Sequence, residues 1–136
     1  MPIEIKEKEL HGIIILEVGG RVAFGQESMD FRAKVKEVLE KSDWIKQRWG
    51  WETRMVLDLG NLSMVDSAGL GALIAARTSA ARCGAGIKLA NLTKRLRDLL
   101  SITKLATVFD VYESVSAAVD SYPQAARAAG GASPQS

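Results

Sequence analysis

The 136-residue sequence is poor in several residue types, and each scarcity excludes a class of site. Cys83 is the only cysteine, so one chain can form neither a disulfide nor a zinc cluster built from cysteines. His11 is the only histidine and lies on a predicted hairpin at the sheet edge, which argues against a Ser-His catalytic pair. The net charge of +2 is too small to indicate direct binding to nucleic acid or to an anionic membrane.

Long apolar runs are missing as well. The longest are a handful of residues, far short of the roughly 20 that a membrane-spanning helix needs. The N-terminus mixes acidic and basic residues from Glu4 onward, with no basic region followed by an apolar run, so we see no secretory signal. Together with the single cysteine, these features predict a soluble protein of the cytoplasm.

Proline is confined to the two ends of the chain, at Pro2, Pro123 and Pro134. No fixed φ angle therefore interrupts the long segment between the first two of them. From Pro123 onward the chain has only small and polar residues with no large apolar side chain, and it cannot bury enough surface to offset its ordering entropy. We predict one folded domain over residues 2–122 and a disordered tail over 123–136.

The spacing of apolar residues predicts an alternation of strands and helices. Short β-branched or alternating runs predict strands, whereas apolar residues three and four apart predict amphipathic helices. The predicted strands cover residues 3–6, 13–18, 55–59, 87–90 and 108–111. The predicted helices centre on residues 31–39, run from Ser67 to Gly84, follow a cap at Thr93, and cover residues 115–122.

The predicted order, β-β-α-β-α-β-α-β-α, is typical of an α/β fold. Strands that are joined through helices predict parallel pairing, because each right-handed crossover places its helix on a face of the sheet. We expect a mostly parallel sheet of about four to five strands that begins with an antiparallel hairpin and is flanked by about four helices.

The motifs of common enzyme classes are missing. A serine hydrolase is expected to carry Gly-x-Ser-x-Gly, but residues 65–69 read Val-Asp-Ser-Ala-Gly, without the first glycine. Neither of the glycine-rich loops that hold phosphates or dinucleotides is present. The carboxylates are scattered along predicted helices, with no converging pair for acid–base catalysis and no metal site. The sequence therefore predicts a protein that is not an enzyme and that uses no cofactor.

The segment 61–71 reads Asn-Leu-Ser-Met-Val-Asp-Ser-Ala-Gly-Leu-Gly and joins a predicted buried strand to a helix. It resembles the signature of the anti-sigma-factor antagonists, the bacterial members of the STAS domain family. The resemblance extends to the strand at 55–59, to Lys94-Arg95-Leu96, and to Val108-Phe109 with the final helix. It covers roughly residues 3–120 and implies a single STAS-like domain.

In that family, a serine at the position of Ser67 is phosphorylated by a partner that is both an anti-sigma factor and a serine kinase. The unphosphorylated protein binds this partner and frees a sigma factor, and a serine phosphatase resets the switch. The resemblance thus implies a phosphoprotein that regulates transcription, as in stress responses, by partner switching. The partner-binding surface that it implies consists of Gly25, Asp66, Ser67, Gly69 and Leu70, with Lys94 and Arg95 at the rim.

The local chemistry of Ser67 agrees with this role. At or beside a helix N-cap, backbone N–H groups point outward and the potential is positive, so a phosphate is tolerated there. The roughly −1.5 to −2 charges of a phosphate beside Asp66 would weaken the binding of a partner by repulsion and desolvation. The alternative is that Asp66 and Ser67 only cap the helix. For Ser63 we expect a loop-stabilising hydrogen bond to the backbone rather than phosphorylation.

Two segments depart from the family pattern. Residues 42–54 form a connection that is normally shorter, and they contain all three tryptophans, Trp44, Trp49 and Trp51. These are either exposed anchors for a partner or part of a longer helix packed on the sheet edge. The second departure is at Val22-Ala23, near which the family has an acidic residue; Glu27 is the candidate substitute.

Two other functions stay open. A STAS module can be a static subunit of a larger assembly, such as a stressosome or a lipid-transport complex. The Asp66-Ser67 loop would then make fixed contacts, and the tryptophan-rich segment would be the anchor. A small ligand could also bind in a shallow pocket near Ser67, although no polar cluster in the sequence indicates one.

Overall fold

The computed structural model describes residues 3–49 and 53–122 of the chain. These residues form one five-stranded sheet in the order β1-β2-β3-β4-β5, in which β1 is antiparallel to β2 and every later pair is parallel. The strands are β1 (Glu4–Leu10), β2 (Ile13–Val22), β3 (Arg54–Val65), β4 (Gly86–Ala90) and β5 (Val111–Tyr112). The helices are α1 (Phe24–Trp49), α2 (Ser67–Arg82), α3 (Lys94–Ile102) and α4 (Val115–Ser121).

This order of elements confirms the predicted α/β class, the N-terminal hairpin and the mostly parallel sheet. The predicted tail, 123–136, lies outside the described residues, and so do Trp51 and the side chains of Trp44 and Trp49. The disordered tail and the two alternatives for the tryptophans therefore stay predictions.

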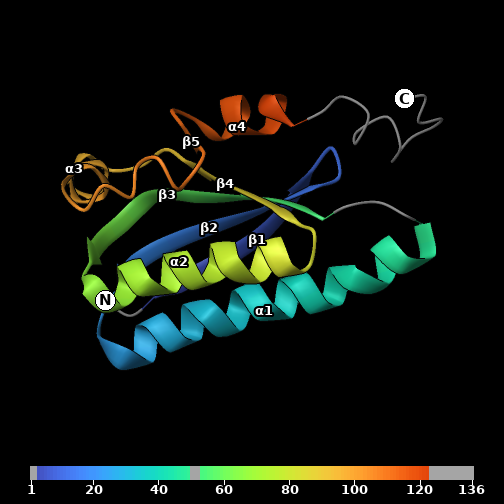
Figure 1. Cartoon of the computed structure of the whole chain (residues 1–136), viewed down its shortest axis with the longest axis horizontal. Coiled ribbons are helices and arrows are strands. Elements are labelled where there is room, and N and C mark those ends of the chain that lie inside the picture. Colours follow the sequence, from blue (N-terminus) through green and yellow to red (C-terminus); the bar gives the residue numbers. More distant parts are fainter. Residues whose placement is uncertain (1–2, 50–52, 123–136) are drawn as a thin grey trace.

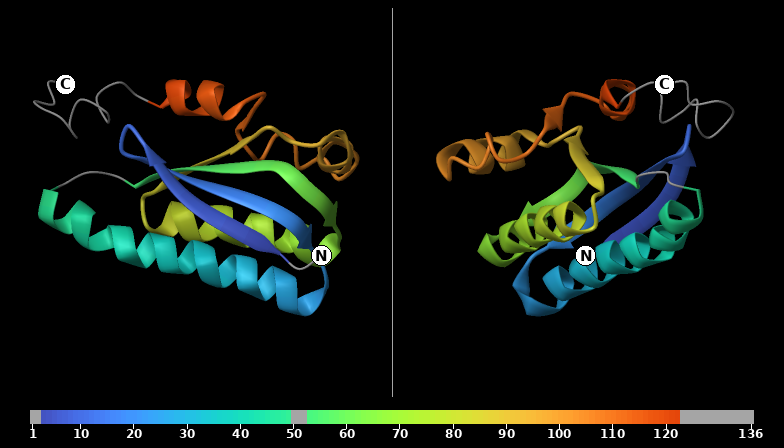
Figure 2. Two further views of the ribbon diagram at one scale, coloured as in Figure 1. Left: turned by 180° about the vertical axis from the view of Figure 1, so that it is seen from behind. Right: turned by 45° about the vertical axis from the view of Figure 1, so that its right-hand side comes forward.

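The sheet carries helices on both faces (Figure 1). α1 and α2 pack side by side on one face, and α4 lies on the other, as the second view in Figure 2 also shows. α3 lies near the end of the sheet toward which the parallel strands run, beside the last residues of β3. The first turns of α1, α2 and α3 therefore lie around that end of the sheet.

A hydrophobic cluster on each face of the sheet holds the layers together. The larger cluster joins the sheet to α1 and α2, and the smaller one joins it to α4. Because side chains alternate along a strand, Met55 and Leu57 of β3 belong to the larger cluster whereas Val56 belongs to the smaller. Each fully buried side chain of this kind stabilises the fold by about 1.5–3 kcal/mol.

β2 and β3 are longer than the sequence predicts. The prediction that Gly19-Gly20 and Gly60 end these strands is wrong, because the strands continue side by side to Val22 and Val65. The register between them shifts twice in this part, and Gly20 has the positive φ of 80° that an irregular strand position can require. As a result, residues 61–65, which the sequence places in a loop, belong to the sheet.

Two further boundaries differ from the prediction. α1 extends well beyond the periodic segment 31–39 at both ends. The last strand, predicted over 108–111, begins only at Val111, because Phe109 is buried in the core and the N–H of Val108 closes a turn. The apolar residues of 108–111 therefore identify the segment that contains the last strand, but they do not show which of its residues pair with β4.

α4 is fixed to the sheet by the aromatic residue at its end. The Tyr122 hydroxyl donates a hydrogen bond to the carbonyl oxygen of Met55 at 2.7 Å. The ammonium of Lys88 lies 4.3 Å from the centroid of the Tyr122 ring, within the range of a cation–π contact. Burial raises the pKa of Tyr122, so the phenol keeps the proton that it donates.

Candidate functional site

One end of the molecule gathers the residues that the sequence marks as functional. β2 and β3 end there, α1 and α2 begin there, and α3 lies alongside (Figure 1). In open α/β sheets, binding sites form outside the carboxyl ends of the parallel strands. Gly25, Ser67 and Arg95 each lie in the first turn of one of these three helices, so the fold brings them to the same end of the sheet.

The start of α2 is capped by Asp66 and not by Ser67. Asp66 has extended φ and ψ, and its Oδ1 accepts a hydrogen bond from the N–H of Gly69 at 2.9 Å. The first helical bond runs from the N–H of Leu70 to the carbonyl of Asp66 at 2.8 Å. Ser67 is the first helical residue and is exposed. The cap is therefore complete without the Ser67 hydroxyl, which remains accessible to another protein.

Gly69 and Leu70 face inward from the same turn. A Cβ atom on Gly69 would overlap the carbonyl oxygen of Val22, so this glycine lets α2 begin against the end of β2. Leu70 is only 8% exposed and belongs to the larger hydrophobic cluster. These two residues hold the turn in place from beneath, while Ser67 occupies its outer side.

The first turn of α1 lies beside this site. Gly25 is exposed, and its carbonyl accepts a hydrogen bond from the Ser28 hydroxyl at 3.0 Å. Glu27, the candidate acidic substitute, is 9% exposed, and its Oε2 accepts hydrogen bonds from Nη2 and Nε of Arg21 at 2.9 and 3.2 Å. Its carboxylate is thus used within the fold, which argues against a direct contact with a partner.

Ser63 bonds to the backbone, as the sequence predicts. Its hydroxyl donates a hydrogen bond to the carbonyl of Gly20 at 3.0 Å, across the irregular part of the β2–β3 pair. This bond occupies the hydroxyl and stabilises the end of the sheet just ahead of Asp66. It distinguishes Ser63 from Ser67, whose hydroxyl lies at the outer surface.

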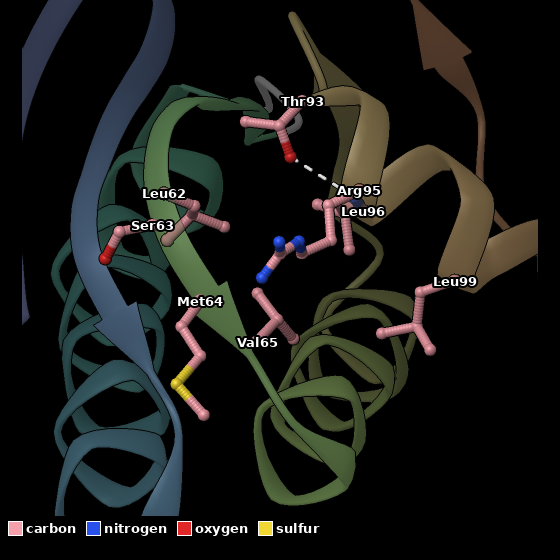
Figure 3. A pocket seen from close by; sticks show the side chains of 8 residues that line it. All are labelled: Leu62, Ser63, Met64, Val65, Thr93, Arg95, Leu96 and Leu99. Carbon is pink, nitrogen blue, oxygen red and sulfur yellow. Dashed lines mark hydrogen bonds between the residues drawn. The ribbon is translucent and has the colours of Figure 1, made fainter.

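A hollow lies between the end of β3 and α3, whereas the pocket that the sequence leaves open was expected near Ser67, which does not line this hollow. Its volume is about 230 Å³, and its lining consists of Leu62, Ser63, Met64, Val65, Thr93, Arg95, Leu96 and Leu99 (Figure 3). The Arg95 side chain extends from α3 toward β3 across this space. Lys94, the other predicted rim residue, is exposed and pairs with Asp98 at 3.1 Å. Both cations therefore border the side of the site that faces away from α1.

The described residues contain neither a metal site nor a membrane-spanning helix. Within 3–49 and 53–122, no group of three or more His, Cys, Asp or Glu side chains is arranged to hold a metal ion. Over the described helices, none combines the length and the apolar character needed to cross a membrane.

The model of the STAS domain family matches residues 4–118 of the sequence. Among solved structures, an anti-sigma factor antagonist from Mycobacterium paratuberculosis is 18% identical, over 87% of this chain and 92% of its own, with a TM-score of 0.66. The Bacillus anti-sigma factor antagonist SpoIIAA, in its unphosphorylated form, is 13% identical over 86% of this chain and 94% of its own, with a TM-score of 0.65.

A protein of a different kind has a similar fold. A sulfate transporter family protein from Wolinella succinogenes is 19% identical over 80% of this chain and 83% of its own, with a TM-score of 0.61. No curated protein matches the sequence. Identities this low show a common fold, and the function has to be argued from the residues of the site.

Proposed function

We propose, because the chain belongs to the STAS domain family, that it is an anti-sigma-factor antagonist whose binding surface is switched off by phosphorylation of Ser67. The observation that carries the proposal is the position of Ser67, exposed in the first turn of α2, next to a cap that Asp66 supplies alone. In this role the serine is a substrate for another protein's kinase and not a nucleophile.

The electrostatics of the first turn favour a change of binding over a change of fold. A phosphate on Ser67 would lie near unpaired backbone N–H groups at the positive end of α2, which tolerate a negative charge. The neighbouring carboxylate of Asp66 is committed to the N–H of Gly69. A partner that covers this turn would have to desolvate roughly −1.5 to −2 additional charges beside that carboxylate, and its affinity would fall.

The proposed partner is an anti-sigma factor with serine-kinase activity, and a serine phosphatase restores the binding form. The exposed part of the surface that it would cover consists of Gly25, Ser67, Lys94 and Arg95. Gly69 and Leu70 would support the surface from within, because both are buried under Ser67. The sigma factor released in this way would alter transcription.

The direct test is phosphorylation followed by binding. The full chain is incubated with ATP and candidate kinases encoded near its gene, and the phosphate is located by mass spectrometry. Ser67→Ala should bind the kinase partner constitutively, whereas Ser67→Glu should lose most of its affinity. A phosphate found only elsewhere, or equal affinities of the two variants, would reject the switch.

Ser116 offers a matched control for charge. It is exposed in the first turn of α4, whose cap is Ser114, and it lies one position further from its cap than Ser67 does. It lies on the opposite face of the sheet (Figure 1). Ser116→Glu should therefore leave the affinity for the partner unchanged, and a loss equal to that of Ser67→Glu would indicate a nonspecific effect of charge.

A second candidate is a static subunit of a larger assembly. It is favoured by the likeness to the sulfate transporter family protein and to SLC26A9, in which the matched part is only 19% of that chain. Purification from native extract separates the two candidates. A partner of kinase size supports the antagonist, whereas a membrane transporter or a large multimer, insensitive to Ser67→Glu, supports the subunit.

A further inference from the structure

We infer that the hollow between β3 and α3 is a binding site for a small amphipathic carboxylate, with the carboxylate at Arg95 and an apolar body against Leu96 and Leu99. The inference goes beyond the proposed function, because the hollow does not include Ser67. It rests on the size of the hollow, on its apolar walls and on Arg95, the cation that lines it among the residues that the structure describes.

The hollow exists because β4 is shorter than β3. β4 pairs with β3 only as far as Asp58, whereas β3 runs on to Val65. At this point the Asp58 carboxylate accepts hydrogen bonds from the N–H of Gly60 at 3.1 Å and from the Asn91 side chain at 3.2 Å. Beyond it, α3 takes the place beside β3 that a strand would fill, and a space of about 230 Å³ remains.

The walls of the hollow are apolar and belong to the core. Leu96 is 2% exposed and Leu62 is also buried, while Val65 and Leu99 are half-buried and pack against the same cluster. Because these residues are fixed by the fold, the hollow is formed before any ligand arrives. Burial of an alkyl group there removes apolar surface from water, which favours binding.

Arg95 supplies the charge that selects the ligand. Its guanidinium extends into the hollow (Figure 3), and no carboxylate of residues 3–49 or 53–122 pairs with it. The nearest acidic side chain along the helix, Asp98, is engaged by Lys94 at 3.1 Å. A guanidinium presents donors in a planar fork that fits a carboxylate with two parallel hydrogen bonds. An anionic group is therefore favoured over a neutral or cationic one.

The outer side of the hollow accommodates the rest of the ligand. A wider depression of about 630 Å³ continues from it, lined by Val65, Lys94, Arg95, Asp98, Leu99 and Ile102. Ile102 is 77% exposed, so its apolar surface is available to a ligand that enters the depression. The lining of the hollow itself is mostly apolar and carries the one fork of Arg95, while Lys94 at the outer depression is paired with Asp98, so a monocarboxylate with an alkyl chain fits better than a ligand with several phosphates.

Octanoate is a suitable probe. The full chain, labelled with ¹⁵N, is titrated with octanoate, octanol and octylamine, which share one chain length and differ in charge. We expect saturable amide shifts from octanoate that are confined to residues 62–65 and 93–102, with weaker binding of octanol and none of octylamine. Equal binding of octanol, or shifts spread over other parts of the sheet, would overturn the assignment.

Substitutions on α3 test the role of the charge. Arg95→Gln should weaken octanoate binding about tenfold, because a hydrogen-bonded charge pair is lost. Arg97→Gln is the matched control, since Arg97 is an exposed cation on the same helix that does not line the hollow. Ile102→Glu should weaken binding and Ile102→Lys should not. Equal affinities of the Arg95→Gln and Arg97→Gln variants would reject the site.

Two more outcomes separate this site from the phosphorylation switch. Ser67→Ala should bind octanoate as the unaltered chain does, whether or not the antagonist function holds. An acidic amphipathic peptide that binds the hollow when octanoate does not would assign it to a protein partner, and would overturn the proposal of a small carboxylate. Thermal unfolding of every variant verifies that the fold is retained.

Discussion

The first turns of α2 and α3 are built alike but lie in different surroundings. Each helix follows a parallel strand, and each is capped by a side-chain oxygen, from Asp66 to the N–H of Gly69 at 2.9 Å and from Thr93 to the N–H of Leu96 at 3.2 Å. α2 begins directly against β2, with no room for a side chain at Gly69. α3 stands off from β3 and leaves a hollow of about 230 Å³.

The difference shows that a cap fixes where a helix begins, whereas the distance to the neighbouring strand decides what that beginning can bind. A turn that is packed closely, as in α2, leaves Ser67 exposed and its neighbours Asp66 and Ala68 half-buried. The first turn of α3 is separated from β3, so it borders a concave surface across which the Arg95 side chain extends. The first turn of α2 therefore suits covalent modification, whereas the first turn of α3 suits the binding of a ligand.

Gly69→Ala should have the largest effect, because it breaks the close packing of α2. The new Cβ would overlap the Val22 carbonyl, which is backbone and cannot rotate away. We expect a loss of about 3 kcal/mol in the free energy of unfolding, at the upper end of the usual cost of overpacking. Chemical denaturation of the full chain measures it.

Gly71→Ala is the matched control for that substitution. A Cβ at Gly71 would meet the Arg32 side chain at 3.6 Å, an ordinary contact. Alanine is a better helix former than glycine, so we expect a gain of about 0.5–1 kcal/mol. If both variants were equally stable, the close approach of α2 to β2 would not be present in solution.

Removal of either cap should have an intermediate and similar effect. Asp66→Ala and Thr93→Ala should each cost about 1 kcal/mol in the free energy of unfolding, because each removes one acceptor for the N–H groups of a first turn. Asp66→Asn should retain the cap and lose only the charge. Unequal costs would show that one of the two turns depends on contacts other than its cap.

The features that a chain segment determines by itself were predictable from the sequence. The cap at Thr93, the helix end near Gly84 and the order of the elements depend on neighbours in sequence, and the structure confirms them. A helix start near Ser67 was also predictable, although the cap belongs to Asp66. In these cases the hydrogen-bond partners lie within a few residues of one another.

The features that depend on other strands were not predictable in the same way. Glycines usually weaken a strand, but β2 continues through Gly19 and Gly20 because β3 supplies partners for both, and β3 continues past Gly60, where the register shifts. The hollow at Arg95 requires that β4 ends before β3 does, which no local pattern encodes. The inward orientation of Leu70 likewise follows from the position of α2 on the sheet.

Ser67→Glu should change stability only slightly, which would sharpen the distinction between switch and fold. A negative charge in the first turn of a helix typically stabilises it by about 0.3–1 kcal/mol, and repulsion from Asp66 would offset part of that gain. We expect a change within about 0.5 kcal/mol by thermal unfolding. A large loss would mean that partner binding fails through unfolding and not through charge.

Arg95→Gln should have the smallest effect on stability, because Arg95 is exposed and has no carboxylate partner among the described residues. A change within about 0.5 kcal/mol is expected. Arg21→Gln provides the contrast, since it would leave the Glu27 carboxylate, 9% exposed, without the bonds at 2.9 and 3.2 Å. The cost of that change should be about 1–3 kcal/mol. Chemical denaturation measures the free energy of unfolding of both variants. If Arg95→Gln lost as much stability as Arg21→Gln, Arg95 would stabilise the fold. If it lost none, Arg95 would be available for a ligand.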